Sequence, residues 1–333
     1  MRQADAAGAA ASEERMRGGG KLQRVAVSAL AAFLLFAAAA ELVLRFAFGL
    51  GNPILIQADP ECEYFLKPDQ NVFRFFVHTR TNQYGMRSDP FPLAHSAGAL
   101  RILFVGDSIT YGTTRVDQRD IFTEILHRDL PAIVNRPVEV LNASAGAWAP
   151  ANELSFLRSR GLFHADLVVL VLNNGDLTQP RATVAEVGED LPLKRPATAI
   201  GELCERYLRP RLLHLLRRGD AGDAMAASAQ QITRENLADL DQIRQLAAAQ
   251  GARMAIAYVP FRRDIPQPAS AAENAFKAWA DAHNLPIFDL TAAELPYTAQ
   301  DITLDNGIHF NARGHAVVAR AIEQSWRQVL ASR

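Results

Sequence analysis

Five short apolar runs, separated by helical stretches, constrain the fold of this 333-residue chain more than any other feature. Runs of this length without polar interruption are typical of parallel strands that are buried on both faces. Helices are expected near 117–130, 150–161, 230–250, 270–283 and 312–331. The alternation predicts a parallel sheet with helices on both faces. The apolar runs are ILFV at 102–105, VEVLN at 138–142, DLVVLVL at 166–172, RMAIAYV at 253–259 and LPIFDL at 285–290.

Polar residues follow the first three runs, and a further polar cluster precedes the last expected helix. The clusters are GDSIT at 106–110, NASAGAW at 142–148, NNGD at 173–176 and DNGIHFN at 305–311. In an open α/β sheet, ligands bind at the carboxyl ends of the strands. We therefore expect these clusters to meet at one edge of the sheet and to form its site.

The four clusters contain the groups that acyl transfer requires. A serine hydroxyl is a weak nucleophile until an imidazole takes its proton, and the imidazole needs a carboxylate to fix its tautomer. Ser108 and His309 are the expected nucleophile and base. The oxyanion of the tetrahedral intermediate needs hydrogen-bond donors. The backbone N–H groups of Ser108 and Gly146 and an asparagine amide after the third run are the candidates.

In their order along the chain, these clusters resemble the GDSL/SGNH hydrolase superfamily. GDSIT matches its first block, Gly146 its second and His309 its last, and the resemblance covers about 99–333. It implies a flavodoxin-like three-layer α/β/α sandwich with the parallel strand order 2-1-3-4-5. It also implies a serine esterase that hydrolyses carboxylic esters through an acyl-enzyme on Ser108, with His309 as general base and no cofactor.

The third block departs from the superfamily pattern, which usually reads G-x-N-D. A gap-free alignment places Gly175 at the position of the asparagine. A shift of one residue places Asn174 there, and a shift of two places Asn173 there. We assign Asn174 to the oxyanion hole, together with Ser108 and Gly146.

The last block also departs from its pattern, D-x-x-H. Asn306 stands three residues before His309, and Asp305 stands four residues before it. We assign Asp305 as the carboxylate that supports the imidazole. Asn306 is the alternative partner, and Asp301 is a second candidate acid.

Several neighbouring residues have simpler structural interpretations. Asp107 is expected to cap the turn after the first strand, and His315 is expected on the last helix, away from the site. Tyr111 and Trp148 either line a substrate pocket or pack in the core, as buried aromatic rings commonly do.

An uncharged run, VAVSALAAFLLFAAAA at 25–40, follows a basic N-terminal segment. A bilayer core requires about 20 mostly apolar helical residues, which the run reaches if it continues through Leu44. The basic flank predicts a cytoplasmic N-terminus. We expect a disordered cytoplasmic tail at 1–24, a single-pass anchor at 25–47, and a periplasmic or extracellular catalytic domain. The anchor and the sequence from YGMRS at 84–88 to RILFVGDSITYG at 101–112 also resemble membrane-anchored bacterial members of the superfamily, which implies a bacterial inner membrane. A cleaved signal peptide and a buried core helix are the alternatives.

Two further segments flank or interrupt the α/β pattern. Residues 48–98 are expected to form an extension with one or two strands that packs against the main domain. Residues 178–229 are an insertion with a basic amphipathic stretch, CERYLRPRLLHLLRR at 204–218. We expect a solvated helix whose leucines pack on the main domain. The alternative is a basic surface that faces lipid headgroups or an anionic polymer.

Composition restricts the partners. The formal net charge of −1 provides no global attraction for nucleic acid. Cys62 and Cys204 lack the spacing of a zinc or redox motif, and either form a disulfide or stay free. The expected partners are a small-molecule or carbohydrate ester and the lipid bilayer. Two alternative functions are an O-acyltransferase that acts on a cell-surface polysaccharide and a non-catalytic polysaccharide-binding or assembly protein.

Overall fold

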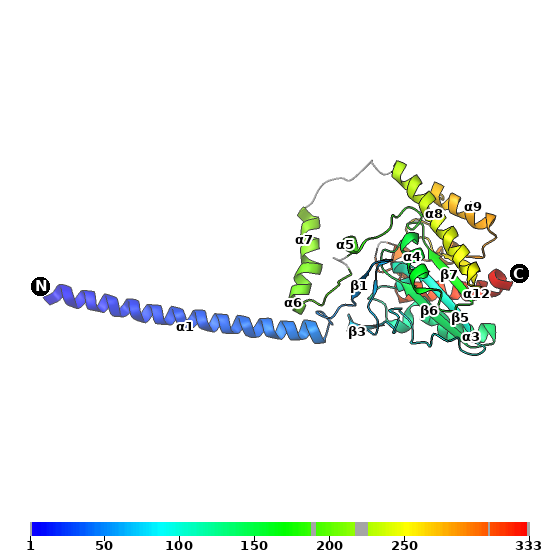
Figure 1. Ribbon diagram of the computed structural model, residues 1–333. Helices are drawn as coiled ribbons and strands as arrows, with labels where there is room; N and C mark the ends of the chain where they lie inside the picture. The colour runs from blue at the N-terminus through cyan, green and yellow to red at the C-terminus, as the bar shows by residue number, and fades with distance from the viewer. Residues whose placement is uncertain (1, 188–190, 217–225, 306, 332–333) are drawn as a thin grey trace.

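The centre of the protein is a parallel five-stranded sheet (Figure 1). The computed structural model describes residues 2–187, 191–216, 226–305 and 307–331. The strand order is β6-β5-β7-β8-β9, and each neighbouring pair is parallel. This order confirms the expected 2-1-3-4-5 topology. The strands are β5 (Leu100–Gly106), β6 (Val138–Ser144), β7 (Leu167–Leu172), β8 (Arg253–Tyr258) and β9 (Ile287–Asp289).

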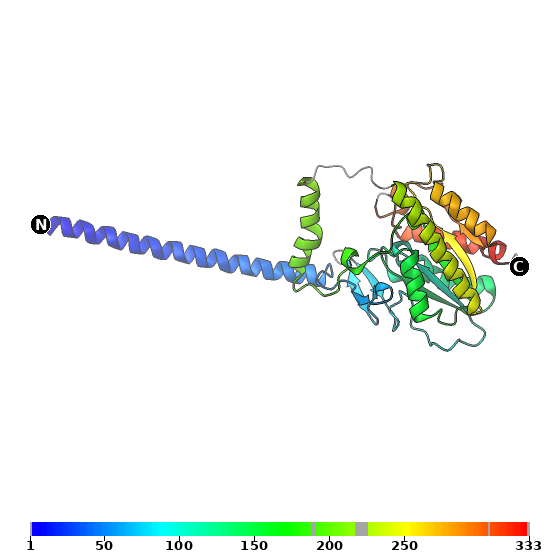
Figure 2. The same cartoon turned by 45° about the horizontal axis from the view of Figure 1, so that its top comes forward.

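Helices cover both faces of this sheet, which accounts for the uninterrupted apolar runs. Successive side chains of a strand point to opposite faces, so Phe104 packs with α3 and α12 while Val105 packs with α4, α8 and α9. Figure 2 shows α8 and α9 side by side on one face. The long helices are α3 (Phe122–Val134), α4 (Pro150–Arg160), α8 (Ala226–Ala249), α9 (Ala271–Ala282) and α12 (Ala312–Ala331).

Short helical turns connect these elements near the carboxyl edge of the sheet. One of them, α2, follows β5 directly and begins at Ser108. The others shape the loops that follow β5 and β9. The short turns are α2 (Ser108–Tyr111), the 3-10 helix η1 (Gln118–Asp120), α10 (Thr291–Glu294) and α11 (Ala299–Ile302).

The extension before the sheet forms two antiparallel hairpins and packs against the main domain. Tyr64 donates a hydrogen bond from its hydroxyl to the Gly146 carbonyl at 2.7 Å, and the Phe65 ring stacks on Trp148 at 5.3 Å between centroids. Trp148 is fully buried and therefore belongs to the core. The hairpins pair β1 (Ile56–Asp59) with β2 (Glu63–Leu66) and β3 (Asn71–Arg74) with β4 (Val77–Arg80).

The insertion after β7 forms a helical rod that stands beside the end of the N-terminal helix. Leu208 and Leu212 on this rod are exposed. The expectation that the leucines of this stretch pack on the main domain is therefore wrong for these two, because the rod lies away from the sheet (Figures 1 and 2). The insertion contains α5 (Val184–Val187), α6 (Ala199–Glu202), the π-helical segment η2 (Leu203–Leu208) and α7 (Arg209–Leu216).

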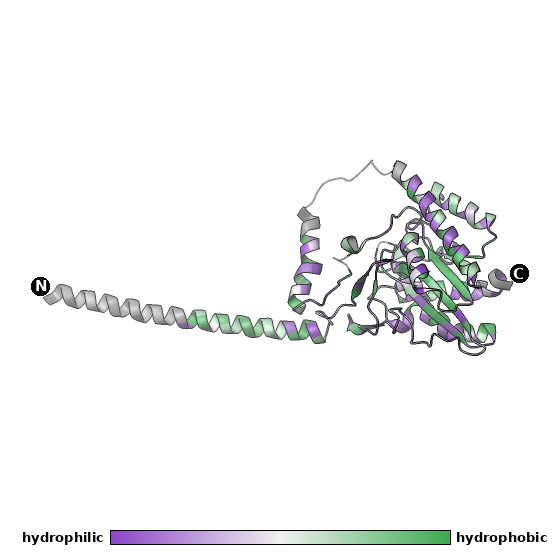
Figure 3. Cartoon of the chain, viewed as in Figure 1, coloured by the Kyte–Doolittle hydropathy of each residue, from purple (hydrophilic) through white to green (hydrophobic). Residues whose placement is uncertain are grey.

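The N-terminal helix α1 (Arg2–Phe46) projects from the globular part. Its stretch Arg24–Phe46 is 23 residues long, with a mean hydropathy of 2.3, and none of it is buried. By length and composition this stretch can cross a membrane (Figure 3). The helix begins at Arg2, so the segment that we expected to be disordered is helical here, as its alanine content favours.

The two cysteines are free thiols. Cys62, the residue before β2, is buried, and burial raises the pKa of its thiol to about 12. Cys204 is exposed on the insertion rod. The disulfide that the sequence left open is therefore not formed.

Candidate active site

The turn from β5 into α2 presents Ser108 at the carboxyl edge of the sheet. Asp107 caps α2 by accepting a hydrogen bond from the Ile109 N–H at 2.8 Å. A Cβ atom on Gly106 would lie 2.2 Å from the Thr110 hydroxyl oxygen, so only glycine fits at this position. The tight turn leaves the Ser108 side chain partly exposed at the start of the helix.

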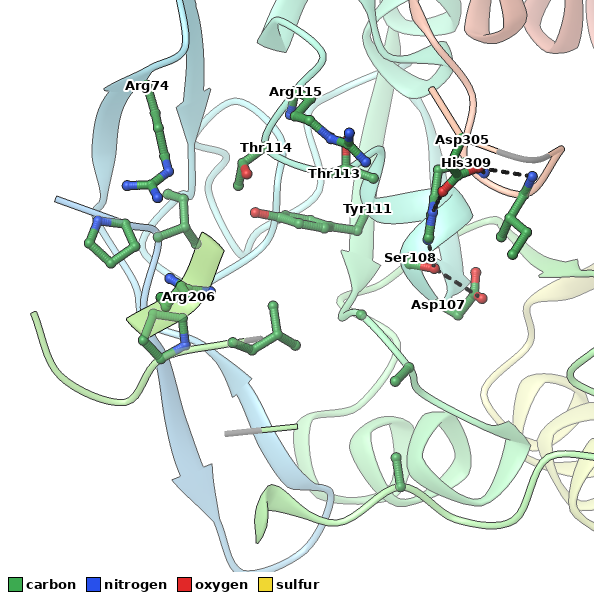
Figure 4. A pocket seen from close by; sticks show the side chains of 18 of the residues that line it. Arg74, Asp107, Ser108, Tyr111, Thr113, Thr114, Arg115, Arg206, Asp305 and His309 are labelled. Carbon is green, nitrogen blue, oxygen red and sulfur yellow. Dashed lines mark hydrogen bonds and ion pairs between the residues drawn. The ribbon is translucent and has the colours of Figure 1, made fainter. Parts of the chain in front are cut away.

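His309 and Asp305 complete a hydrogen-bonded chain with Ser108 (Figure 4). The Nε2 atom of His309 lies 3.0 Å from Ser108 Oγ, and its Nδ1 atom lies 2.6 Å from Asp305 Oδ2. The carboxylate therefore holds the proton on Nδ1 and leaves Nε2 free to accept the serine proton. The structure thus brings together the three residues that the sequence suggested as nucleophile, base and acid.

A bulged loop explains how Asp305 reaches a histidine four residues later. Asp305 Oδ1 accepts hydrogen bonds from the backbone N–H groups of Ile308 at 3.1 Å and His309 at 2.9 Å. Gly307 has a φ of 89°, a conformation that favours glycine. A Cβ atom there would also lie 2.7 Å from the backbone nitrogen of Arg263. Asn306, the alternative partner, lies outside the described residues.

The same hydrogen bonds keep Asp305 ionised. Partial burial raises the pKa of this carboxyl, but the hydrogen bonds from the His309 ring and backbone outweigh burial and lower the pKa below its usual value. A negative carboxylate next to Nδ1 is suited to stabilise an imidazolium at this position.

Asp301, the second candidate acid, serves a different purpose. Its carboxylate accepts hydrogen bonds from the backbone N–H of Thr298 at 2.8 Å and from the Thr298 hydroxyl at 2.7 Å, which caps α11. His315 is also engaged elsewhere, because its Nδ1 accepts a hydrogen bond from the Phe122 N–H at 3.3 Å. Burial, and then the charge of Arg87, lower the pKa of His315 to about 3, so its ring is neutral.

Two backbone donors at the site are available for an oxyanion. In the part of the chain that the structure describes, neither the Ser108 N–H nor the Gly146 N–H has a hydrogen-bond acceptor. Both residues line the cavity that contains the Ser108 hydroxyl. A free N–H that points at developing negative charge is the usual element of an oxyanion hole.

The two asparagines after β7 have different surroundings. Asn173 is buried, and its Nδ2 donates to Asp107 Oδ2 at 3.1 Å, next to the nucleophile. Asn174 donates from Nδ2 to Asp264 at 2.8 Å, and its Oδ1 accepts from the Phe261 N–H at 2.9 Å. The amide of Asn174 therefore fastens the loop after β8, and the structure does not bring it to Ser108.

Gly175 explains why Asn173 can reach the site. The Oδ1 atom of Asn173 accepts hydrogen bonds from the N–H groups of Gly175 at 2.7 Å and Asp176 at 3.2 Å. A Cβ atom on Gly175 would lie 2.8 Å from this oxygen. The Asn173 side chain thus occupies the space that a side chain at position 175 would need.

Three buried carboxyl groups influence one another next to Ser108. Burial raises the pKa of Asp107, Glu153 and Asp176, and that of Glu153 rises to about 8. The negative charge of Asp107 adds to the rise at the other two groups. Glu153 has no hydrogen-bond partner for either oxygen within the described residues. Burial and the lack of a partner therefore favour the protonated form of Glu153 in the folded protein.

A cavity of about 1260 Å³ surrounds Ser108 and His309. Beyond the site loops, its walls come from the extension, with Leu50 and Phe75, and from the insertion, with Arg206 and Arg211. Sequence reasoning missed these wall residues, because no motif marks them. Among the described residues, no group of three His, Cys, Asp or Glu side chains is placed to hold a metal ion.

The fold and this site together define a class: a doubly wound α/β protein with a serine, a histidine and an aspartate at the carboxyl edge of its sheet. The model of the GDSL-like lipase/acylhydrolase family matches residues 104–317, well over half of the chain. The chain belongs to this family and is a hydrolase of the GDSL/SGNH type. No curated protein matches the sequence.

Solved structures with a similar fold include two carbohydrate esterases. A two-domain esterase active on acetylated mannans, crystallised with mannopentaose, is 15% identical with a TM-score of 0.46, and the match covers 70% of this chain and 50% of that one. This chain thus spans about half the length of that esterase. An acetylxylan esterase from Geobacillus stearothermophilus is 14% identical with a TM-score of 0.42, over 70% of this chain and 95% of that one. At sequence identities this low, the substrates of these esterases are not assigned to this chain.

Proposed function

We propose that the protein is a serine esterase that hydrolyses carboxylic esters through an acyl-enzyme on Ser108. The observation that carries the proposal is the unbroken chain of hydrogen bonds from Asp305 through His309 to Ser108, with distances of 2.6 and 3.0 Å. These distances lie within the range that proton transfer between a nucleophile and its base requires.

In the first half-reaction, Ser108 Oγ attacks the ester carbonyl carbon while its proton moves to His309 Nε2. The carbonyl oxygen becomes an oxyanion and accepts hydrogen bonds from the backbone N–H groups of Ser108 and Gly146. The carbon–oxygen bond to the alcohol then breaks, and the alcohol leaves with the proton from His309. In the second half-reaction, water attacks the acyl carbonyl carbon while His309 Nε2 takes its proton. The bond between Ser108 Oγ and the acyl group then breaks, His309 returns the proton to Ser108 Oγ, and the acid is released.

We assign the third oxyanion donor to the Asn173 amide in place of Asn174. Asn173 Nδ2 and Ser108 Oγ both lie near Asp107 Oδ2, at 3.1 and 3.5 Å. The Asn174 amide has both of its ends engaged with the loop after β8. An amide that is fixed on one side by a buried carboxyl is preorganised, which is what an oxyanion hole requires.

The proposed substrate is an ester of a larger alcohol, such as an O-acetyl carbohydrate. The cavity volume of about 1260 Å³ exceeds the range of roughly 300–1,000 Å³ that a small ligand occupies. This space also favours a second candidate function, transfer of the acyl group to a carbohydrate hydroxyl, because an acceptor can enter beside the acyl-enzyme. A complete serine–histidine–aspartate chain argues against a non-catalytic binding protein.

For its location, we propose a single membrane span at 25–47 with the catalytic domain outside the cytoplasm. The stretch Arg24–Phe46 has the length and hydropathy of a span, and basic residues precede it. A cleaved signal peptide is the competing interpretation of the same helix.

The experiment that tests the function is product analysis with the purified full-length protein. Acetylated oligosaccharides and simple acetyl esters are supplied with and without a carbohydrate acceptor, and the Ser108→Ala variant is the control. Acetate release that depends on Ser108 supports the esterase. Transfer of acetyl to the acceptor without net acetate supports the acyltransferase, and no turnover of any ester by the wild type overturns both.

A further inference from the structure

Exposed apolar side chains of the globular part gather at one place. Outside α1, the described residues include eight exposed large apolar side chains, and five of these lie on elements next to the end of α1. Four of the five, Phe48, Phe76, Leu208 and Leu212, form a group that we call the collar. Their exposed fractions are 37%, 68%, 51% and 59%. An apolar group of this kind on a protein surface marks an interaction site.

The collar is built from three segments that contact one another. Phe48 follows α1 directly, and its ring lies 5.7 Å from that of Phe76 at the tip of the β3–β4 hairpin. The neighbouring Phe75 packs edge-on against Tyr207 of the insertion rod at 5.9 Å. Leu208 follows Tyr207 in the rod. The chain just after α1, the hairpin tip and the rod therefore form one assembly.

Hydrogen bonds fasten the rod to α1 at the end of the apolar stretch. Glu41 accepts hydrogen bonds from the backbone N–H groups of Ala199 at 2.8 Å and Ile200 at 3.0 Å, at the start of α6. Arg45 donates to Glu41 at 2.7 Å. In Figures 1 and 2 the rod runs crosswise to α1 beside its C-terminal end. When α1 stands across a bilayer, the rod consequently lies along its surface.

A buried ion pair holds the rod against the hairpin. Arg74 of β3 donates to the Glu202 carboxylate, and both side chains are almost fully buried. Glu202 also accepts a hydrogen bond from the Gly51 N–H at 2.5 Å, which ties down the segment that follows α1. These contacts fix the rod against the hairpin. The buried pair is costly to break, because removing one partner would leave a buried charge uncompensated.

The charges beside the collar suit an anionic surface. Leu208 and Leu212 lie one turn apart on the same face of the rod, and Arg211, next to Leu212 in the chain, lies on the adjoining face that lines the cavity around Ser108. Arg209 and Arg211 are exposed, and neither makes an ion pair with any residue that the structure describes. Glu205 is the acidic residue on the exposed part of the rod. Apolar side chains next to basic ones are the pattern of a helix that lies in a membrane interface.

We propose that the collar docks onto the surface of an anionic bilayer, the same bilayer that α1 spans. This inference rests on the proposed membrane anchor. The cavity around Ser108 shares its walls with the collar assembly, through Phe75, Tyr207 and Arg211. Docking places the cavity next to the lipid headgroups and favours esters that are held at the membrane over esters in free solution.

The position of the collar is tested with fluorescent labels on the full-length protein in vesicles of phosphatidylcholine and phosphatidylglycerol. In a Cys204→Ser background, in which Cys62 remains as a buried thiol, one cysteine at a time replaces Leu212, Leu35 or Leu93. Leu35 lies in α1, and Leu93 is an exposed leucine outside the collar. We expect spin-labelled lipids to quench the labels at 35 and 212 but not at 93. Equal access of aqueous iodide to the labels at 212 and 93 would overturn the proposal. An unquenched label at 35 would instead overturn the anchor.

The consequence for activity is tested with a collar variant, Phe76→Ser combined with Leu212→Ser. Neither residue lines the cavity, so hydrolysis of a water-soluble ester should be unchanged. Hydrolysis of an ester embedded in anionic vesicles should fall by about fivefold, because two interfacial side chains are lost. Leu93→Ser is the matched control. An equal fall for both substrates, or no fall for either, contradicts membrane docking. If the wild type hydrolyses neither ester, the proposed esterase activity is contradicted. The label experiment still tests whether the collar docks onto the membrane.

Discussion

The Nε2 atom of His309 lies 3.0 Å from Ser108 Oγ, although 201 positions separate the two residues in the chain. The turn after β5 and the loop before α12 meet at the same edge of the sheet. An isolated bridge between Thr303 and Phe310 closes the loop, and the Leu304 N–H donates to the His309 carbonyl at 2.7 Å. The position of His309 therefore depends on a short, closed loop that also carries Asp305.

The role of Asp305 predicts a large loss of activity when its carboxylate is removed. We expect Asp305→Ala to lower kcat by on the order of 10³- to 10⁴-fold, because the imidazole loses its orientation and its compensating charge. Asp301→Ala is the control, since that carboxylate caps α11. Steady-state kinetics on a chromogenic acetyl ester measure both. A larger loss for Asp301→Ala, with the fold intact, would reject Asp305 as the supporting acid.

The two asparagines after β7 give a second prediction. We expect Asn173→Ala to lower kcat by on the order of 10²-fold or more, the scale for the loss of one preorganised donor. Asn174→Ala should affect kcat only mildly. Thermal melting of both variants controls for damage to the buried turn, because Asn173 also accepts backbone hydrogen bonds. The opposite ranking would return the oxyanion role to Asn174.

The buried carboxyl of Glu153 leads us to predict that the free energy of unfolding depends on pH. Burial, and then the charge of Asp107, raise the pKa of its carboxyl from 4.5 to about 8 in the folded state. Between these values the folded protein binds more protons than the unfolded chain, so the free energy of unfolding falls as the pH rises. Glu153→Gln removes this component, and one pKa unit corresponds to about 1.4 kcal/mol.

Chemical denaturation of the wild type and of Glu153→Gln at pH 5 and pH 8 measures the effect. We expect the wild type to lose more stability between these pH values than the variant does, by at least about 1.4 kcal/mol. The comparison uses the slope with pH, because glutamine also leaves polar atoms buried at this position. Equal slopes for the two proteins would show that Glu153 ionises as freely in the folded state as in the unfolded one.

The proposed location makes a fourth prediction. Alkaline phosphatase fused after residue 60 should be active, because the enzyme folds only outside the cytoplasm and basic residues before the span keep the N-terminus inside. The mass of the fusion, measured in both the membrane and the soluble fraction, then separates the two interpretations of α1. An intact N-terminus supports the anchor, a shortened one supports a signal peptide, and an inactive fusion contradicts both.

Much of the fold follows from local patterns in the sequence. The run at 166–172 is apolar at nearly every position because β7 is buried on both faces, and that property identifies a central parallel strand from sequence. The order of the strands follows from the resemblance to the superfamily. Ser108 and His309 are recognisable in the sequence because Ser108 begins a helix and His309 lies three residues before one, at the edge where such sheets bind ligands.

The remaining features depend on contacts that no local pattern records. The choice between Asn173 and Asn174 depends on which side chain points toward Asp107 where β7 ends, and a change of one residue reverses that direction. The exposure of Leu208 depends on the position of the rod. A hydrogen bond between Glu41 and Ala199, which are 158 positions apart in the chain, fixes that position. The cavity walls likewise combine the extension with the insertion, and neither segment carries a catalytic motif.

The central claim is that Ser108 and His309 act as one catalytic unit, and a double-mutant comparison tests it most directly. The kcat for an acetyl ester is measured for Ser108→Ala, His309→Ala and the double variant, with folding checked by circular dichroism. We predict that each single variant loses about as much activity as the double variant, on the order of 10⁶-fold, because residues in one unit do not contribute additively. Full activity of Ser108→Ala, or losses that multiply in the double variant, would contradict the account.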